Sequence, residues 1–168
     1  MLTVTNVSSF AERSKNSGQG SMGKNSEADK PKILILATLS GGYAGADSVG
    51  QIHAHYPTNT YIFPVICPSM FPEEFYLQSF KRGIDGIIVM YSGTDSPYKG
   101  GPERAAKLIN QTYPLMKEQG IDTRRLKLAA ICTVCTKPFL KNVQDMDQLL
   151  SEIGYVENEI AAHASERA

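Results

Sequence analysis

The chain has 168 residues, and its 17 Lys and Arg residues balance its 17 Asp and Glu residues. One domain with a proper core is expected, and this balance gives no indication of nucleic acid or anionic lipid as a partner. No apolar run approaches the roughly 20 residues needed to span a membrane, and the N-terminus lacks a secretory signal pattern. Three cysteines, an odd number, favour a reducing compartment over a disulfide framework. We expect a cytoplasmic protein.

The first 31 residues are rich in Ser, Asn, Gly and Lys and have no sustained hydrophobic period. A disordered tail is predicted, because too little apolar surface is available to offset the entropy of ordering. A docking arm that orders on a partner is the alternative.

Residues 32–39 form a nearly unbroken apolar run that ends in Ser40, Gly41 and Gly42. Such a run predicts a strand buried on both faces, followed by a sharp turn. Pro64 lacks an N–H and therefore marks its strand as an edge strand or a bulge. Further strands are predicted at 60–66, 86–91 and 126–131, and helices at 44–56, 72–82, 102–116 and 138–153. Residues 155–168 are expected to be a C-terminal tail, either a frayed helix or a second contact arm.

Four strands that alternate with four helices predict an α/β fold with a doubly wound, mostly parallel sheet and helices on both faces. Ligands of such sheets bind outside the carboxyl ends of the strands. The loops at 40–47, 67–71, 92–101 and 132–137 lie at this edge, and they carry all three cysteines.

The loop with Gly41, Gly42 and Gly45 is one candidate site, because glycine backbones at a helix N-terminus suit anions. The loop matches neither common nucleotide-binding glycine motif, and no lysine follows it. A tight structural turn is therefore favoured over a nucleotide or small-molecule site. Asp47 is then a charge that the helix dipole favours.

The pair Cys132-x-x-Cys135 is the sharper candidate, since it lies where a strand gives way to a helix. Such a pair can support dithiol chemistry or supply half of a metal or cluster site, with Cys67 as a third ligand. Buried structural thiols are the alternative. No arrangement typical of a hydrolase is present, and the three histidines receive no role.

Several motifs together suggest a family. They are Tyr43-Ala44-Gly45-Ala46-Asp47, His55-Tyr56-Pro57, Val65-Ile66-Cys67, Pro72-Glu73-Glu74-Phe75, Phe80-Lys81-Arg82-Gly83-Ile84-Asp85-Gly86, Glu103-Arg104, Gly120-Ile121 and Arg124-Arg125-Leu126. Over residues 32–154 the chain resembles the delta subunit of methyl-viologen-reducing hydrogenase. The resemblance implies a small iron–sulfur subunit that passes electrons between a hydrogenase or dehydrogenase and heterodisulfide reductase, or a domain of related sulfur-metabolising complexes.

The chain departs from that family at the cysteines. The resemblance implies cluster ligands at the positions of Thr38, Gly41, Cys67, Ser92 and approximately Pro97, of which this chain retains Cys67. A cluster held by thiolates normally needs four of them. We therefore expect that the [2Fe–2S] site of the family is lost and that no cofactor is bound.

The first functional hypothesis is an accessory or scaffolding subunit of a heterodisulfide-reductase-like electron-transfer complex, not catalytic by itself, whose partners are other protein subunits. The alternative is a redox protein that uses Cys132 and Cys135, with Cys67, as a dithiol or as a rearranged metal or [2Fe–2S] site. A weaker alternative is a binding module built on residues 41–45.

Overall fold

Four parallel strands form the centre of the computed structural model, which describes residues 30–93, 96–132 and 135–167. The strands lie in the order β2-β1-β3-β4, and each neighbouring pair is parallel. They are β1 (Ile33–Thr38), β2 (Thr60–Val65), β3 (Gly86–Tyr91) and β4 (Leu126–Ala130). The predicted α/β fold with a parallel sheet is confirmed. The expected tail at 1–31 lies almost wholly outside the described residues.

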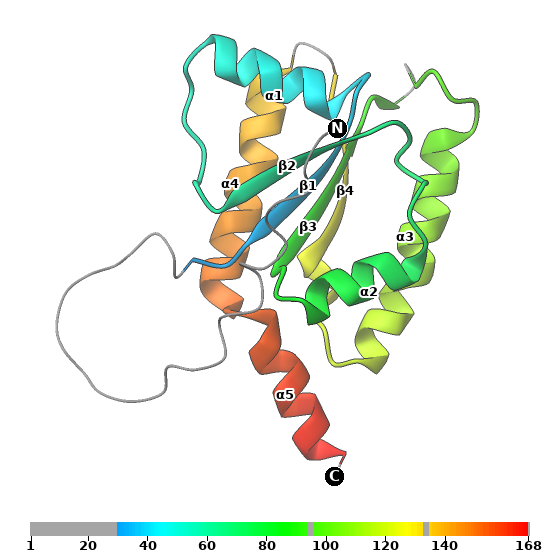
Figure 1. The fold of residues 1–168 in the computed structure, drawn as a ribbon, viewed down its shortest axis with the longest axis vertical. Coiled ribbons are helices and arrows are strands. Elements are labelled where there is room, and N and C mark those ends of the chain that lie inside the picture. The colour runs from blue at the N-terminus through cyan, green and yellow to red at the C-terminus, as the bar shows by residue number, and fades with distance from the viewer. Residues whose placement is uncertain (1–29, 94–95, 133–134, 168) are drawn as a thin grey trace, which may run out of the picture.

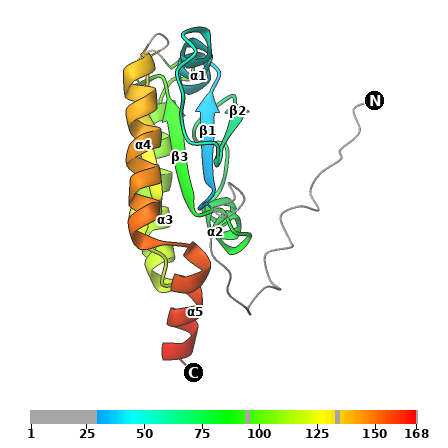
Figure 2. The same cartoon turned by 90° about the vertical axis from the view of Figure 1, so that its left-hand side faces the viewer.

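Helices cover both faces of this sheet (Figures 1 and 2). One face packs against α1 (Gly42–Gln51) and α4 (Thr136–Ile153), and the other packs against α2 (Glu73–Lys81) and α3 (Gly101–Glu118). A short 3-10 helix, η4 (Thr123–Arg125), precedes β4, and α5 (Val156–Glu166) follows α4. None of the helices in the described part of the chain is long and apolar enough to cross a membrane.

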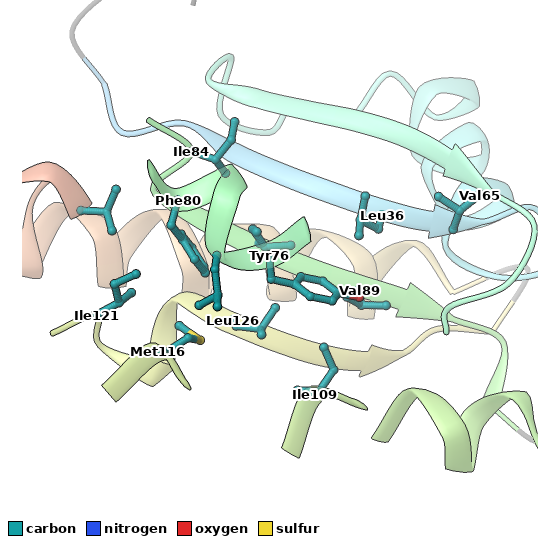
Figure 3. Packing of buried hydrophobic residues seen from close by; sticks show 13 residues of the cluster. Leu36, Val65, Tyr76, Phe80, Ile84, Val89, Ile109, Met116, Ile121 and Leu126 are labelled. Carbon is teal, nitrogen blue, oxygen red and sulfur yellow. The ribbon is translucent and has the colours of Figure 1, made fainter. Parts of the chain in front are cut away.

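The central strand β1 has a buried side chain on each face, which explains its unbroken apolar sequence. Ile35 is fully buried in the cluster under α1 and α4, whereas Leu36 is buried in the cluster under α2 and α3. Figure 3 shows this second cluster, in which Tyr76 and Phe80 of α2 pack over the sheet. Burial raises the pKa of Tyr76, whose hydroxyl has no hydrogen-bond partner among the residues that the structure describes. The free energy gained by burying the aromatic side chains of this layer therefore exceeds the cost of one unsatisfied hydroxyl group.

Strand β2 is an outer strand of the sheet, as Pro64 predicts. The carbonyl oxygen of Val65 accepts from the Leu39 N–H at 3.0 Å, so Val65 points its backbone groups toward β1. Because alternate residues of a strand point their backbone groups in opposite directions, the N–H missing at Pro64 belongs to the free edge. The proline costs the sheet no internal hydrogen bond.

Helix α1 differs from its predicted extent of 44–56, since it spans 42–51. Val49 is its last fully buried residue. The chain then turns at His53, which has a φ of 52°, and the Ala54 N–H donates to the Val49 carbonyl at 3.2 Å. The helix therefore ends well before Pro57, and Tyr56 packs against Phe139 of the core from outside the helix.

A buried guanidinium joins three elements at the amino end of the sheet. Arg125 is fully buried, and its side chain forms an ion pair with Glu159 of α5, with the nearest atoms 2.8 Å apart. It also donates to the carbonyl oxygens of Asp85, just before β3, and of Gly154, at the end of α4. The carboxylate of Asp85 accepts from the N–H of Val156 at 3.0 Å. The start of α5 is thereby fastened to the sheet.

In the C-terminal tail at 155–168, for which the sequence predicts a frayed helix or a second contact arm, residues 156–166 form a helix, α5. Its first residue, Val156, is fully buried in the cluster under α2 and α3. The remainder of α5 runs beyond the amino ends of the strands (Figure 2). One apolar anchor and one buried ion pair therefore extend the domain past Gly154.

We expect Glu159→Gln to lower the free energy of unfolding by about 3 kcal/mol, because it leaves the buried Arg125 charge without its partner. Glu157→Gln, on the exposed side of the same helical turn, should change it by less than about 0.5 kcal/mol. Urea denaturation of both variants measures the difference. Equal effects would mean that Arg125 does not depend on this carboxylate.

Candidate functional site

The loops after β1 and β3 meet at the carboxyl edge of the sheet, where the strand order reverses direction. Open α/β sheets bind ligands in a crevice at such a point. Here the hydroxyls of Ser40 and Ser92 are hydrogen-bonded at 3.1 Å, and Ser92 is buried. A Cβ atom added to Gly41 would lie 2.5 Å from the backbone nitrogen of Ser92. The two loops thus close the crevice against each other.

The other glycines of the first loop serve the packing of α1. A Cβ atom on Gly42 would lie 2.5 Å from the Cβ of Met90, and one on Gly45 would lie 3.1 Å from Ile131. Asp47, one turn into the helix, accepts a hydrogen bond from Gln51 at 2.8 Å. These contacts favour the tight turn over the nucleotide loop, because the glycines let a helix approach the sheet.

Cys67 follows β2 at one outer edge of the sheet. It is partly exposed, and its sulfur lies 3.2 Å from the Ser69 hydroxyl. A Cβ atom on Gly101, where α3 begins, would lie 3.9 Å from this sulfur. Cys67 therefore sits beside the start of α3, in a setting of hydroxyl and backbone groups.

Cys132 and Cys135 lie at the opposite outer edge, after β4, and they form a disulfide with Cα atoms 5.2 Å apart. Three strand intervals separate this edge from Cys67, which corresponds to roughly 14 Å. The structure therefore brings two of the three cysteines together and leaves Cys67 apart. Within the described residues, no group of three or more His, Cys, Asp or Glu side chains is arranged to hold a metal ion.

A shallow hollow of about 470 Å³ gives access to this pair. Both cysteines are partly exposed and line it, together with Ser92 and Gly93 from the loop after β3 and Pro138 from α4. Cys135 is the N-cap of α4, which begins without a side-chain cap. The pair is thus reachable from solvent at the start of a long helix. Residues 133–134 lie outside the described part.

The positions that the resemblance implies as cluster ligands carry other groups here. Thr38 is buried, and in the described part of the chain its hydroxyl has no hydrogen-bond partner. The Ser92 hydroxyl is hydrogen-bonded to that of Ser40, and Pro97 is exposed. Cys67 supplies one thiol, and position 41 has no room for any side chain. These residues do not fit a cluster held by four thiolates.

Four exposed apolar side chains near the carboxyl end of β2 escaped the sequence analysis. Each is exposed by half or slightly more, and we call them the apolar edge patch: Leu39 (55%), Phe63 (53%), Ile66 (56%) and Met70 (51%). The hydrogen bond from Leu39 to Val65 brings the chain after β1 beside the chain after β2. The signal in the sequence was Leu39 and Ile66, apolar residues directly beyond two strands, which we assigned to the strands themselves.

Comparison with known protein families decides the relationship. The model of FlpD, described as methyl-viologen-reducing hydrogenase, delta subunit, matches residues 33–154, which is most of the described chain. The chain belongs to this family. The resemblance inferred from the sequence motifs is confirmed, and the match ends where α4 gives way to α5.

Relatives of this delta subunit family member include proteins of two sizes. A 119-residue stretch is 31% identical to a ferredoxin:CoB-CoM heterodisulfide reductase subunit of Methanosarcina mazei and covers 70% of this chain. The chain spans about 15% of that protein's length. The iron-sulfur subunit of the F420-non-reducing hydrogenase of Archaeoglobus profundus is 28% identical over 131 residues, with 77% of this chain and 95% of that protein covered. The family supplies subunits of hydrogenase and heterodisulfide reductase complexes.

We expect Gly41→Ala to lower the free energy of unfolding by roughly 2 kcal/mol, since the new methyl group would strike the backbone of Ser92. Gly50→Ala, inside the helix that Gly41 precedes, is the matched control, because a Cβ there meets nothing within 4 Å. It should be neutral or stabilise by up to about 1 kcal/mol. Thermal denaturation of both variants tests the closed crevice, and equal stabilities would contradict it.

Proposed function

We propose that this chain is an accessory, scaffolding subunit of a heterodisulfide-reductase-like electron-transfer complex and carries no [2Fe–2S] cluster of the family's kind. The observation that carries this proposal is the close approach of Gly41 to the backbone of Ser92, which leaves no room for a Cβ atom at position 41. This approach lies at the point of the sheet where open α/β sheets bind ligands. By itself the protein catalyses no reaction.

The donor atoms at the carboxyl edge support the loss of the cluster. Hydroxyls replace thiols at Thr38 and Ser92, and a neutral hydroxyl is a poor substitute for a thiolate at iron. The Ser40 and Ser92 hydroxyls are also engaged with each other. The hydroxyls at the carboxyl edge of the sheet are therefore consistent with a structural contact between two loops.

The apolar edge patch supports a docking role. Its side chains lie at or shortly after the carboxyl ends of β1 and β2, two strands whose ends the Leu39–Val65 hydrogen bond holds side by side, and exposed apolar groups concentrated in one region mark an interaction site. The occupant that we propose is a larger heterodisulfide-reductase-like subunit. In the Methanosarcina mazei relative the matched stretch is a small part of a long polypeptide, so the same kind of domain works there as part of a larger protein.

Docking at this edge would use side chains rather than strand addition. An incoming strand needs the outward N–H groups of β2, and Pro64 removes one of them. Phe63 and Ile66, one on each side of that proline, offer apolar surface instead. A partner with a complementary apolar face fits this arrangement.

Anaerobic purification followed by iron and acid-labile sulfide analysis tests the first half of the proposal. We expect a colourless protein with much less than one equivalent of iron per chain, because the edge lacks four thiolates. Stoichiometric iron and sulfide, with visible absorbance, would refute it.

Charge placed in the apolar edge patch tests the second half. When the chain is titrated by calorimetry into a separately purified, long heterodisulfide-reductase polypeptide from the same source, Ile66→Lys should lower the affinity at least tenfold, since it would bury a charge. Ile52→Lys is the control, because Ile52 is equally exposed at the far end of α1. Equal losses from both substitutions, or none from Ile66→Lys, would contradict the proposed surface.

A further inference from the structure

We propose that Cys132 and Cys135 form a reversible dithiol–disulfide couple that exchanges two electrons with a protein dithiol approaching through the hollow beside α4. This inference does not rest on the proposed scaffolding role, since it uses neither the apolar edge patch nor the family's ligand positions. The proposed redox site consists of Cys132 and Cys135 and leaves out Cys67.

The backbone geometry around Cys132 and Cys135 is compatible with the disulfide, the oxidised form of the pair. The Cα atoms of the two residues lie 5.2 Å apart, within the range that a disulfide spans, and the Cys135 N–H donates to the Cys132 carbonyl at 3.1 Å. This hydrogen bond joins the backbones of Cys132 and Cys135 and does not involve the sulfurs. We therefore expect the disulfide to open and close without movement of β4 or α4.

The reduced form has a place for a thiolate. Cys135 is the N-cap of α4, a helix of 18 residues that has no side-chain cap. Pro138, the third residue of that helix, has no N–H, so the N–H of Lys137 is the one from which the Cys135 sulfur can accept a hydrogen bond. The partial positive charge at the start of a helix favours an anionic sulfur there.

Access distinguishes this pair from a structural disulfide. Both cysteines are partly exposed and line the hollow with Ser92, Gly93 and Pro138. Exchange begins by attack of an external thiolate on a sulfur, so a reachable pair is a requirement. A disulfide buried in the core would not meet it.

The exchange balances with a dithiol as reductant. A thiolate of the donor attacks one sulfur of the pair, the Cys132–Cys135 bond breaks, and a mixed disulfide forms while the other cysteine leaves as a thiolate. The donor's second thiolate then attacks the donor sulfur of the mixed disulfide and releases the second cysteine. The chain gains two electrons and takes up two protons, and the donor leaves as a disulfide.

Redox titration of the full chain tests the proposal, with reduced and oxidised glutathione as the probe and maleimide–polyethylene glycol to count free thiols. In the Cys67→Ser variant, both remaining thiols should disappear together. Their fraction oxidised should rise from one tenth to nine tenths over about an eighty-fold change in the ratio of oxidised glutathione to the square of reduced glutathione. Circular dichroism should be the same at both ends, because β4 and α4 do not move.

Cys132→Ser and Cys135→Ser supply the matched controls. Each should abolish the concerted loss of thiols and should form a stable mixed disulfide with glutathione at the remaining cysteine, which the intact pair resolves. Three results would overturn the proposal: thiols that stay reduced in the most oxidising buffer, a disulfide that dithiothreitol opens only in denatured protein, or stoichiometric zinc that either substitution removes.

Discussion

The buried guanidinium of Arg125 is the contact on which the arrangement of this domain depends. A charge enclosed by protein is costly unless every donor finds an acceptor, and Arg125 finds them on the approach to β3, at the end of α4 and in the first turn of α5. These segments are far apart in the sequence, and their positions at the amino end of the sheet are fixed by one side chain. The candidate-site loops lie at the opposite, carboxyl edge of the same sheet, so their positions depend on this arrangement of the amino end.

The two ends of the sheet explain why the family relationship remains visible although the ligand positions differ. Asp85 and Arg125 belong to the motifs that carry the resemblance, and both lie at the amino end, where they hold the chain together. Gly45 likewise serves close packing against Ile131. Substitution of residues with such roles is costly to the fold, whereas Thr38 and Ser92, at positions that the resemblance implies as cluster ligands, carry hydroxyls within the same fold.

The strands and most helices could be predicted because their signals are local. Gly86–Tyr91 was predicted to the residue, since a strand buried on both faces leaves no polar position, and Gly83 and Gly154 mark helix ends through their positive φ. The early end of α1 and the folding of α5 depend on what each helix meets in space. The separation of Cys67 from Cys132 and Cys135 depends on strand order, and the closed crevice depends on contact between Gly41 and Ser92. Neither the separation of the cysteines nor the closed crevice could be predicted from a local sequence pattern.

Pro64 has a further consequence for how this protein behaves at high concentration. An outer strand with a complete row of free backbone groups can recruit the same strand from other molecules and grow into stacked sheets. The apolar surface of Phe63 and Ile66 would promote such growth, and the proline between them interrupts the row of donors. The chain can therefore keep an exposed apolar surface at β2 for a partner, while this outer strand remains a poor template for fibril growth.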